Sequence, residues 1–152
     1  MYSCTRSPNC EDAVLKIIQH TNALVVIKST VTPDILTRLY NSVHDDDKLR
    51  ITHNPEFLTA RTAYHDFHNQ KRIVLGSSKS VIREELDMVH DFYHKHYPSA
   101  EIVVCHSDES ECMKIFVNCF YASKIQLFNE FYMVCEHMNL DFSNIKNLML
   151  GN

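Results

Sequence analysis

Apolar residues recur along the chain in short blocks whose spacing alternates between that of helices and that of strands. The spacing predicts an amphipathic helix over residues 11–20 and a buried strand over residues 24–27. Thr32 and Pro33 then offer an N-cap and a first-turn proline for a second helix, whose apolar stripe extends to Val43.

The same alternation continues to the end of the chain. The further elements predicted are a strand near residues 50–52, a strand at 72–75 closed by Gly76, a helix at about 79–97, a strand at 102–105, a helix at about 109–137, and a last short helix capped by Asp141 or Ser143. Strands that alternate with helices predict an α/β fold built on a doubly wound parallel sheet. The longest helix exceeds what a small domain needs, so we expect part of it to pack on another domain or subunit.

Composition narrows the class of protein. The chain has 152 residues, of which 45% are hydrophobic and 22% are charged, as in ordinary folded domains, so disorder is excluded. Its only glycines are Gly76 and Gly151. A dinucleotide fingerprint and a phosphate-binding P-loop both need several glycines close together, and these two glycines cannot form either motif.

Charge and apolar runs exclude several partners. The formal net charge is −4 and no basic stripe is present, so we expect no nucleic-acid partner. The longest apolar run, residues 23–27, is far too short to span a membrane, and the first residues carry no secretory pattern, so we expect a cytoplasmic protein. The six cysteines should then be reduced. Cys112 and Cys119 lie on the apolar side of the predicted long helix, and we expect them to be buried in the core of the protein.

Polar residues that directly follow predicted strands are the first candidates for a site, because ligands bind beyond the carboxyl ends of such strands. The segments Lys28–Val31 and Asn54–Leu58 meet this condition, and each has a plain alternative as a helix cap or a solvated carboxylate. On the long helix, Lys114 and Asn118 are four residues apart and share a face, although the lysine could simply extend to solvent. Together these groups are suited to polarising an oxygen and positioning a water molecule.

Histidines raise the alternative of a metal site. His90 and His94 are four apart on a predicted helix, with His96 nearby, which is a spacing that two metal ligands could share. Because the surrounding run is polar and lies at a helix end, we favour a solvated face. We expect His65 and His68 to lie at the surface as well.

Four ordered motifs cover almost the whole chain. They are Val26–Val31 (VIKSTV), Asn54–Leu58 (NPEFL), Arg72–Gly76 (RIVLG), and a stretch that contains Lys114, Asn118–Lys124 (NCFYASK) and Phe128–Glu130 (FNE). In order, spacing and residue type they resemble the UDP-glucose/GDP-mannose dehydrogenases. The resemblance implies an NAD-dependent enzyme that oxidises the sugar 6-hydroxyl twice, through an aldehyde-level stage and a cysteine thioester, to a nucleotide-linked uronic acid.

The resemblance also implies roles for individual residues. Glu56 matches a glutamate that assists thioester hydrolysis through water, and Thr30 matches a threonine that helps hold that water near the cofactor. Lys114 matches a lysine that stabilises oxyanion charge, and Asn118 matches its asparagine partner at the sugar. The expected contacts are Glu56, Phe57, Leu58, Lys114 and Asn118 for the nucleotide sugar, UDP-glucose or GDP-mannose, and Ser29 and Thr30 for NAD.

The sequence also departs from the family pattern. Ala60 replaces a second glutamate, Arg61 replaces the following glycine, and Asp34 replaces the glycine after the Ser-Thr-Val-Pro run, which predicts altered contacts in these loops. The glycine-rich first unit and the Gly-Gly-x-Cys-Phe loop of the family have no match in these residues. We therefore expect an internal or shortened piece of such an enzyme, with no turnover of its own.

The resemblance finally implies a domain division. Residues 1–107 would form the C-terminal part of a Rossmann-like NAD-binding domain, and residues 108–152 the long central helix and the start of a dimerisation domain, with a homodimer formed through that helix. The alternative is a noncatalytic remnant or interaction module. Such a module should self-associate, or bind a complete dehydrogenase, while ignoring nucleotide sugars.

Overall fold

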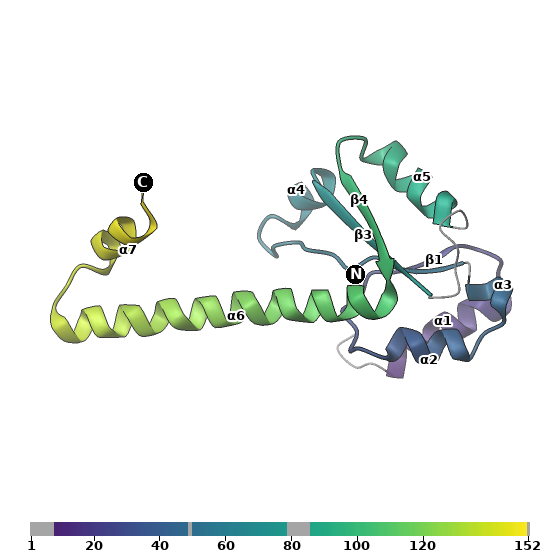
Figure 1. The fold of residues 1–152 in the computed structure, drawn as a ribbon, viewed down its shortest axis with the longest axis horizontal. Helices are drawn as coiled ribbons and strands as arrows, with labels where there is room; N and C mark the ends of the chain where they lie inside the picture. The colour runs from purple at the N-terminus through teal and green to yellow at the C-terminus, as the bar shows by residue number, and fades with distance from the viewer. Residues whose placement is uncertain (1–7, 49, 79–85, 152) are drawn as a thin grey trace. The chain divides into compact units, whose positions relative to one another are not determined.

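A computed structural model describes residues 8–48, 50–78 and 86–151. The chain divides into two compact units, Met1–Ile115 and Phe116–Asn152, and each is described by itself (Figure 1).

The first unit follows the predicted alternation of helices and strands. Its elements are α1 (Pro8–His20), β1 (Val25–Ile27), α2 (Ile35–Asn41), α3 (Asp45–Lys48), β2 (Ile51–His53), α4 (Ala63–His68), β3 (Arg72–Ser77), α5 (Asp87–His96), β4 (Glu101–His106) and the first turns of α6 (Ser107–Met138). The pattern predicted neither α3, a four-residue helix where it indicated an acidic turn, nor α4, a six-residue helix. The first part of the helix predicted at 79–97 lies outside the described residues.

The four strands form one sheet in the order β1-β2-β3-β4. The pairs β1–β2 and β3–β4 are parallel, as predicted, whereas β2 and β3 are antiparallel and meet at His53 and Gly76. The α/β, Rossmann-like class with a long following helix is therefore confirmed, but the sheet is mixed. An apolar run marks a strand as buried without marking its direction, so the sequence could not predict this pairing.

Two apolar clusters hold the helices on the sheet. One joins α1 and α2 to β1 and β2 through side chains such as Ile27, Leu36 and Leu39. The other joins β3 to α5 through Leu75 and Val89 among others. In Figure 1, α1 and α2 lie together on one side of the strands and α5 lies on the other.

Two predicted boundaries differ from the structure. The N-cap of α2 is Asp34, not Thr32, and Asp34 has a positive φ of 85° and no capping hydrogen bond from its own side chain. The third strand does not close at Gly76 but continues to Ser77. At the start of α2, a residue from α6 provides the cap, as described below, and Ser77 extends β3 by pairing with His106 of β4.

The second unit consists of the rest of α6 and of α7 (Phe142–Leu150). The predicted cap is confirmed, because the Asp141 carboxylate accepts from the backbone N–H groups of Ser143 and Asn144. Cys135 is buried, but Cys119 is exposed, so its assignment to a core was wrong. Across the described residues, no helix combines the length and the apolar content that a membrane span requires.

Candidate catalytic site

The first turns of α6 present a polar face to the sheet. Ser107, Ser110 and Glu111 are almost completely buried, and Lys114 follows on the same side of the helix at the spacing i, i+3, i+4 and i+7. This arrangement is the reverse of the usual one, in which the apolar side of a helix packs against the rest of the protein. Each of these polar groups therefore needs a partner on the sheet or on its loops.

Gly76 lets α6 approach the sheet closely. A Cβ atom at this position would lie 2.1 Å from Ser110 Oγ and 3.1 Å from Ser107 Cα. Because only glycine leaves that space, the close packing of β3 on the start of α6 explains why one of the two glycines of the chain is found inside a strand.

His53 is fully buried at the end of β2 and faces Ser110. Its Nδ1 lies 2.7 Å from Ser110 Oγ, and Ser110 Oγ lies 2.8 Å from Ser107 O. The Nε2 atom lies 3.3 Å from Ser29 O. Burial lowers the pKa of His53 to about 4, against the opposing effect of the Ser29 carbonyl and with some help from the charge of Lys28.

Lys114 reaches from α6 to the segment that follows β2. Its Nζ donates to the backbone oxygen of Glu56 at 2.5 Å and lies 4.9 Å from the centre of the Phe57 ring. Burial lowers the pKa of the Lys114 ammonium, and the Glu56 carboxylate raises it. The two residues most strongly expected at the site, Glu56 and Lys114, are therefore brought together.

Asn54 links the segment around Glu56 to three other elements. Its Nδ2 donates to Val74 O of β3 at 2.9 Å, and its Oδ1 accepts from the Lys28 ammonium at 2.8 Å and from the Tyr93 hydroxyl of α5 at 2.6 Å. Its backbone N–H donates to Ile27 O of β1 at 2.8 Å. With these bonds, the fully buried Asn54 fixes where the chain leaves β2.

The other residues expected at the site are less closely joined. Ser29 approaches His53 through its backbone oxygen, Thr30 is exposed, and Leu58 is half-buried. Asn118 is exposed and belongs to the second unit. The structure thus brings Glu56, Phe57 and Lys114 together, and the roles of all seven residues stay predictions.

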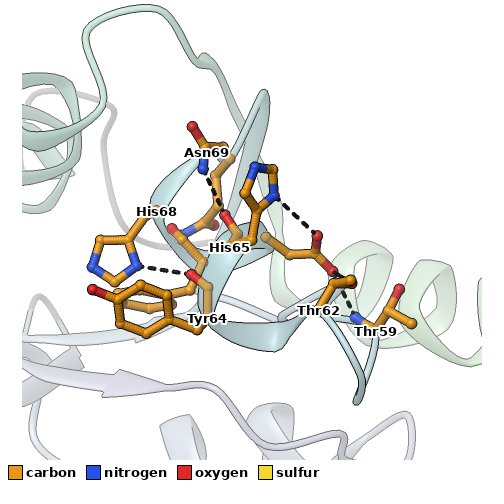
Figure 2. A network of polar contacts seen from close by, with 9 residues as sticks. Thr59, Thr62, Tyr64, His65, His68 and Asn69 are labelled. Atoms are coloured by element: carbon orange, nitrogen blue, oxygen red, sulfur yellow. Dashed lines mark hydrogen bonds and ion pairs between the residues drawn. The ribbon is translucent and has the colours of Figure 1, made fainter.

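The loop after Glu56 is held by Asp66. Its carboxylate accepts from the Thr59 backbone N–H at 3.0 Å and from the Thr62 hydroxyl at 2.8 Å, which ties the loop to α4 (Figure 2). These hydrogen bonds lower the pKa of Asp66. They span Ala60 and Arg61, two of the three residues that depart from the family pattern, and both are exposed.

The histidines outside β2 lie at or near the surface. His65 and His68 are exposed, and the ring Nδ1–H of His68 donates to Tyr64 O within α4 (Figure 2). The rings of His90 and His94 stack with their centres 6.0 Å apart. Among the described residues, no three groups of metal-ligating type come close enough to hold an ion.

The polar residues that organise this region were not predicted individually. His53, Ser110 and Glu111, together with Tyr93, are absent from the expected site, although the polar spacing at 107, 110, 111 and 114 was visible in the sequence. Their contacts join segments tens of residues apart, and only the fold reveals such contacts.

Strands that alternate with helices form an α/β protein of the Rossmann-like class. The polar side chains at the carboxyl ends of β1 and β2, which face the start of a long helix, lie where such proteins bind their ligands. The profile of the UDP-glucose/GDP-mannose dehydrogenase family, NAD binding domain, matches residues 8–96, and the profile of the central domain of that family matches residues 108–151. The chain belongs to the UDP-glucose/GDP-mannose dehydrogenase family.

Individual relatives agree with this assignment. The UDP-glucose 6-dehydrogenase of Rickettsia bellii is 34% identical over 144 residues, which is 92% of this chain and 32% of the relative. A UDP-glucose dehydrogenase structure from Pyrobaculum islandicum matches with a TM-score of 0.73 and 26% identity over 92% of this chain and 33% of that one. The GDP-mannose dehydrogenase structure from Pseudomonas aeruginosa shares the fold, with a TM-score of 0.76 and 20% identity over 96% and 34% of the two chains. The chain thus spans about a third of the length of these proteins.

Proposed function

We propose that the chain is part of an NAD-dependent nucleotide-sugar dehydrogenase that oxidises the sugar 6-hydroxyl of UDP-glucose or GDP-mannose to a uronic acid. The observation that carries this proposal is the contact of the Lys114 ammonium with Glu56 O, at the carboxyl end of β2 in a member of this family. A cation fixed there can stabilise negative charge that develops on the oxygen of a sugar intermediate.

The other roles follow the same chemistry. The Glu56 carboxylate would orient the water that hydrolyses a thioester, with the Thr30 hydroxyl as a second partner of that water. Asn118 would hydrogen-bond the sugar beside Lys114, and the segment of Phe57 and Leu58 would line the sugar. The nucleophilic cysteine of such a reaction is not assigned to any cysteine described here.

The family domain that matches residues 8–96 is described as an NAD binding domain, so NAD is the cofactor we propose. Its pyrophosphate needs closely approaching backbone, usually supplied by glycines. Gly76 does not supply it, because the space beside its Cα is taken by Ser110, and Gly151 follows α7 in the second unit. The described residues thus do not fit the pyrophosphate, and we assign only Ser29 and Thr30 as candidate cofactor contacts.

The test measures NADH formation by the native gene product, whose intact mass is also measured. If that mass exceeds the mass of these 152 residues, we expect NAD reduction with UDP-glucose or GDP-mannose and a loss of at least about 100-fold in kcat for Lys114→Met. The matched control is Lys16→Met, which removes an exposed ammonium on α1. Absence of NADH with every nucleotide sugar would contradict the proposal.

The 152-residue chain by itself should form no NADH with either nucleotide sugar. This expectation follows from the lack of a pyrophosphate cradle and of an assigned nucleophile among the described residues. Turnover by the purified 152-residue protein would show that the site is complete without them.

A second candidate function is association through α6. Several large apolar side chains of the second unit are exposed, including Phe116 at 69%, Phe120 at 64% and Ile125 at 64%. Exposed apolar side chains in such number favour a partner surface, and a second copy of the chain, giving a homodimer, is the occupant we propose. Sedimentation should show a dimer that Phe120→Lys weakens, whereas a monomer at all concentrations would contradict the homodimer.

A further inference from the structure

The side chain of His53 joins the loop that carries Thr30 to the start of the helix that carries Lys114. It is fully buried at the end of β2. Its Nδ1 lies 2.7 Å from Ser110 Oγ, and Ser110 precedes Lys114 by one turn of α6. Its Nε2 lies 3.3 Å from Ser29 O, and Ser29 directly precedes Thr30. One imidazole therefore contacts two segments on which candidate catalytic residues lie.

The packing of the sheet makes the contact with α6 possible. Gly76 of β3 is the partner of His53 across the two strands, and a Cβ atom at this glycine would lie 2.1 Å from Ser110 Oγ. The Ser110 hydroxyl thus occupies the space that a side chain at position 76 would fill, within hydrogen-bonding distance of the imidazole. A side chain at Gly76 would push Ser110 away from His53.

The placement of Thr30 depends on its two neighbours, because Thr30 itself is exposed. On one side, Val31 is buried in the apolar cluster beneath α2. On the other side, the carbonyl of Ser29 and the N–H of Thr30 belong to one planar peptide group. A hydrogen bond from His53 to Ser29 O therefore fixes the orientation of the peptide plane from which Thr30 begins.

The number of protons decides which contacts of His53 and Ser110 are hydrogen bonds. The gap from Ser107 O to Ser110 Oγ is 2.8 Å, and that from Ser110 Oγ to Nδ1 is 2.7 Å. The third gap, from Nε2 to Ser29 O, is 3.3 Å. Burial lowers the pKa of His53 to about 4, so the ring is neutral near pH 7 and supplies one proton, as the Ser110 hydroxyl does. Two protons cannot fill three gaps, so one contact has no hydrogen bond.

The contact that best tolerates this lack is the one at Ser107 O. Since α6 begins at Ser107, this carbonyl also accepts the helical hydrogen bond from the backbone N–H of Glu111. The Ser110 hydroxyl can then donate to Nδ1, and the ring proton lies on Nε2, where it donates to Ser29 O. With the ring proton on Nδ1, the bare Nε2 would face the Ser29 oxygen, and two acceptors would repel each other.

We propose that His53 is a positioning residue of the candidate catalytic site, which donates from Nε2–H to Ser29 O and accepts at Nδ1 from the Ser110 hydroxyl. The ring thereby fixes the backbone at Thr30 relative to the start of α6. This inference rests on the proposed roles of Thr30 and Lys114. A hydroxyl that must hold one water molecule needs a backbone that does not rotate. Because the imidazole is fully buried, it acts through Ser29 and not on the substrate.

Nitrogen-15 NMR of the histidine rings of the 152-residue protein, near pH 7, tests where the proton lies. Protonated and bare ring nitrogens have well-separated resonances, and the signals of His53 are those lost in His53→Gln. We expect a protonated Nε2 and a bare Nδ1, whose resonance shifts in Ser110→Ala because the accepted hydrogen bond is lost. Ser42→Ala, at an exposed serine after α2, is the matched control and should shift neither resonance. A proton on Nδ1 alone would overturn the proposal.

Two amide replacements separate the two contacts of the ring. Glutamine places its amide where Nε2 lies and can still donate to Ser29 O, whereas asparagine reaches only the position of Nδ1, beside Ser110. The Thr30 amide shares the peptide plane of Ser29 O, so its nitrogen-15 order parameter reports the restraint directly. We expect an order parameter of about 0.85 in the unchanged protein and in His53→Gln, and of less than about 0.6 in His53→Asn.

The control for the replacements is His65→Asn, at an exposed histidine of α4, which should leave the Thr30 amide unchanged. The amide of Val74, buried in β3, shows whether each variant keeps its fold. With Val74 ordered, equal order parameters of Thr30 in His53→Gln and His53→Asn would overturn the proposal. Where the asparagine variant does not fold, the position of the ring proton decides.

None of these measurements needs a nucleotide sugar or NAD. Their failure is therefore distinct from a failure to form NADH.

Discussion

The carboxylate of Glu111 accepts a hydrogen bond from the backbone N–H of Leu36 at 2.9 Å, across 75 positions of sequence. Its other oxygen accepts from the backbone N–H of Asp34 at 3.2 Å. Both N–H groups belong to the start of α2, where a helix has donors without partners and favours negative charge. A residue of α6 therefore caps α2, where the Asp34 side chain makes no capping hydrogen bond.

The variant Glu111→Gln tests this contact. Glutamine keeps the size of the side chain but replaces one acceptor oxygen with a donor, so one N–H at the start of α2 loses its partner in a buried place. We expect the free energy of unfolding to fall by about 1–3 kcal/mol in urea unfolding followed by circular dichroism. Glu109→Gln, at an exposed position, should lower the free energy of unfolding less. Equal losses of stability in the two variants would show that the Glu111 cap contributes no more than an exposed glutamate.

The variant Gly76→Ala tests the close approach of β3 and α6. The added Cβ would meet Ser110 Oγ and Ser107 Cα, so one of the elements must shift, and we expect a loss of stability of about 2 kcal/mol or more. Ser110→Ala in the same chain should recover part of it, because the nearest clashing atom is removed. Additive effects of the two changes in a double-mutant cycle would contradict this packing.

The pH dependence of stability should report His53. Its pKa is about 4 in the folded chain and near 6.5 when unfolded, so the unfolded state takes up the proton first as the pH falls. Stability is therefore present above pH 6.5 and is lost progressively between pH 6.5 and pH 4, by roughly 3 kcal/mol for this residue.

The control for this prediction is His53→Gln, which has no proton to gain. Glu111 titrates in the opposite sense, because burial raises its pKa against the hydrogen bonds from Leu36 and Asp34, and it does so in both proteins. The difference between the two stability curves thus isolates His53. Parallel curves between pH 4 and pH 6.5 would exclude a neutral, buried imidazole.

The variant Thr52→Val should stabilise the protein. Thr52 is fully buried in β2, and its hydroxyl has no hydrogen-bond partner among the described residues. Valine keeps the shape and removes an unsatisfied polar group, so we expect the free energy of unfolding to rise by about 1 kcal/mol. Thr52→Ser, which keeps the hydroxyl and loses the methyl group, should instead destabilise. A destabilised valine variant would indicate a hydroxyl partner.

Much of the architecture follows from local patterns. The apolar runs predicted each strand of the sheet, and the helical stripe predicted α6 to within two residues at its first end and one at its last. Asp141 was one of the two caps predicted, and it does cap α7, because its side chain accepts from the backbone N–H groups two and three residues on. Interactions of this kind depend on sequence spacing, and the sequence contains that information.

For the candidate site, too, some features follow from local sequence and others only from the tertiary structure. The sequence alone predicted which segments would carry chemistry, namely Lys28–Val31, Asn54–Leu58 and the face of Lys114, because polar groups after strands and at helical spacing are local features. Only the tertiary structure decided that Lys114 meets Glu56, that Asn54 joins Lys28 to Tyr93, and that Glu111 caps α2. These contacts join positions 26 to 75 residues apart, and their energies depend on burial, which exists only once the chain has packed.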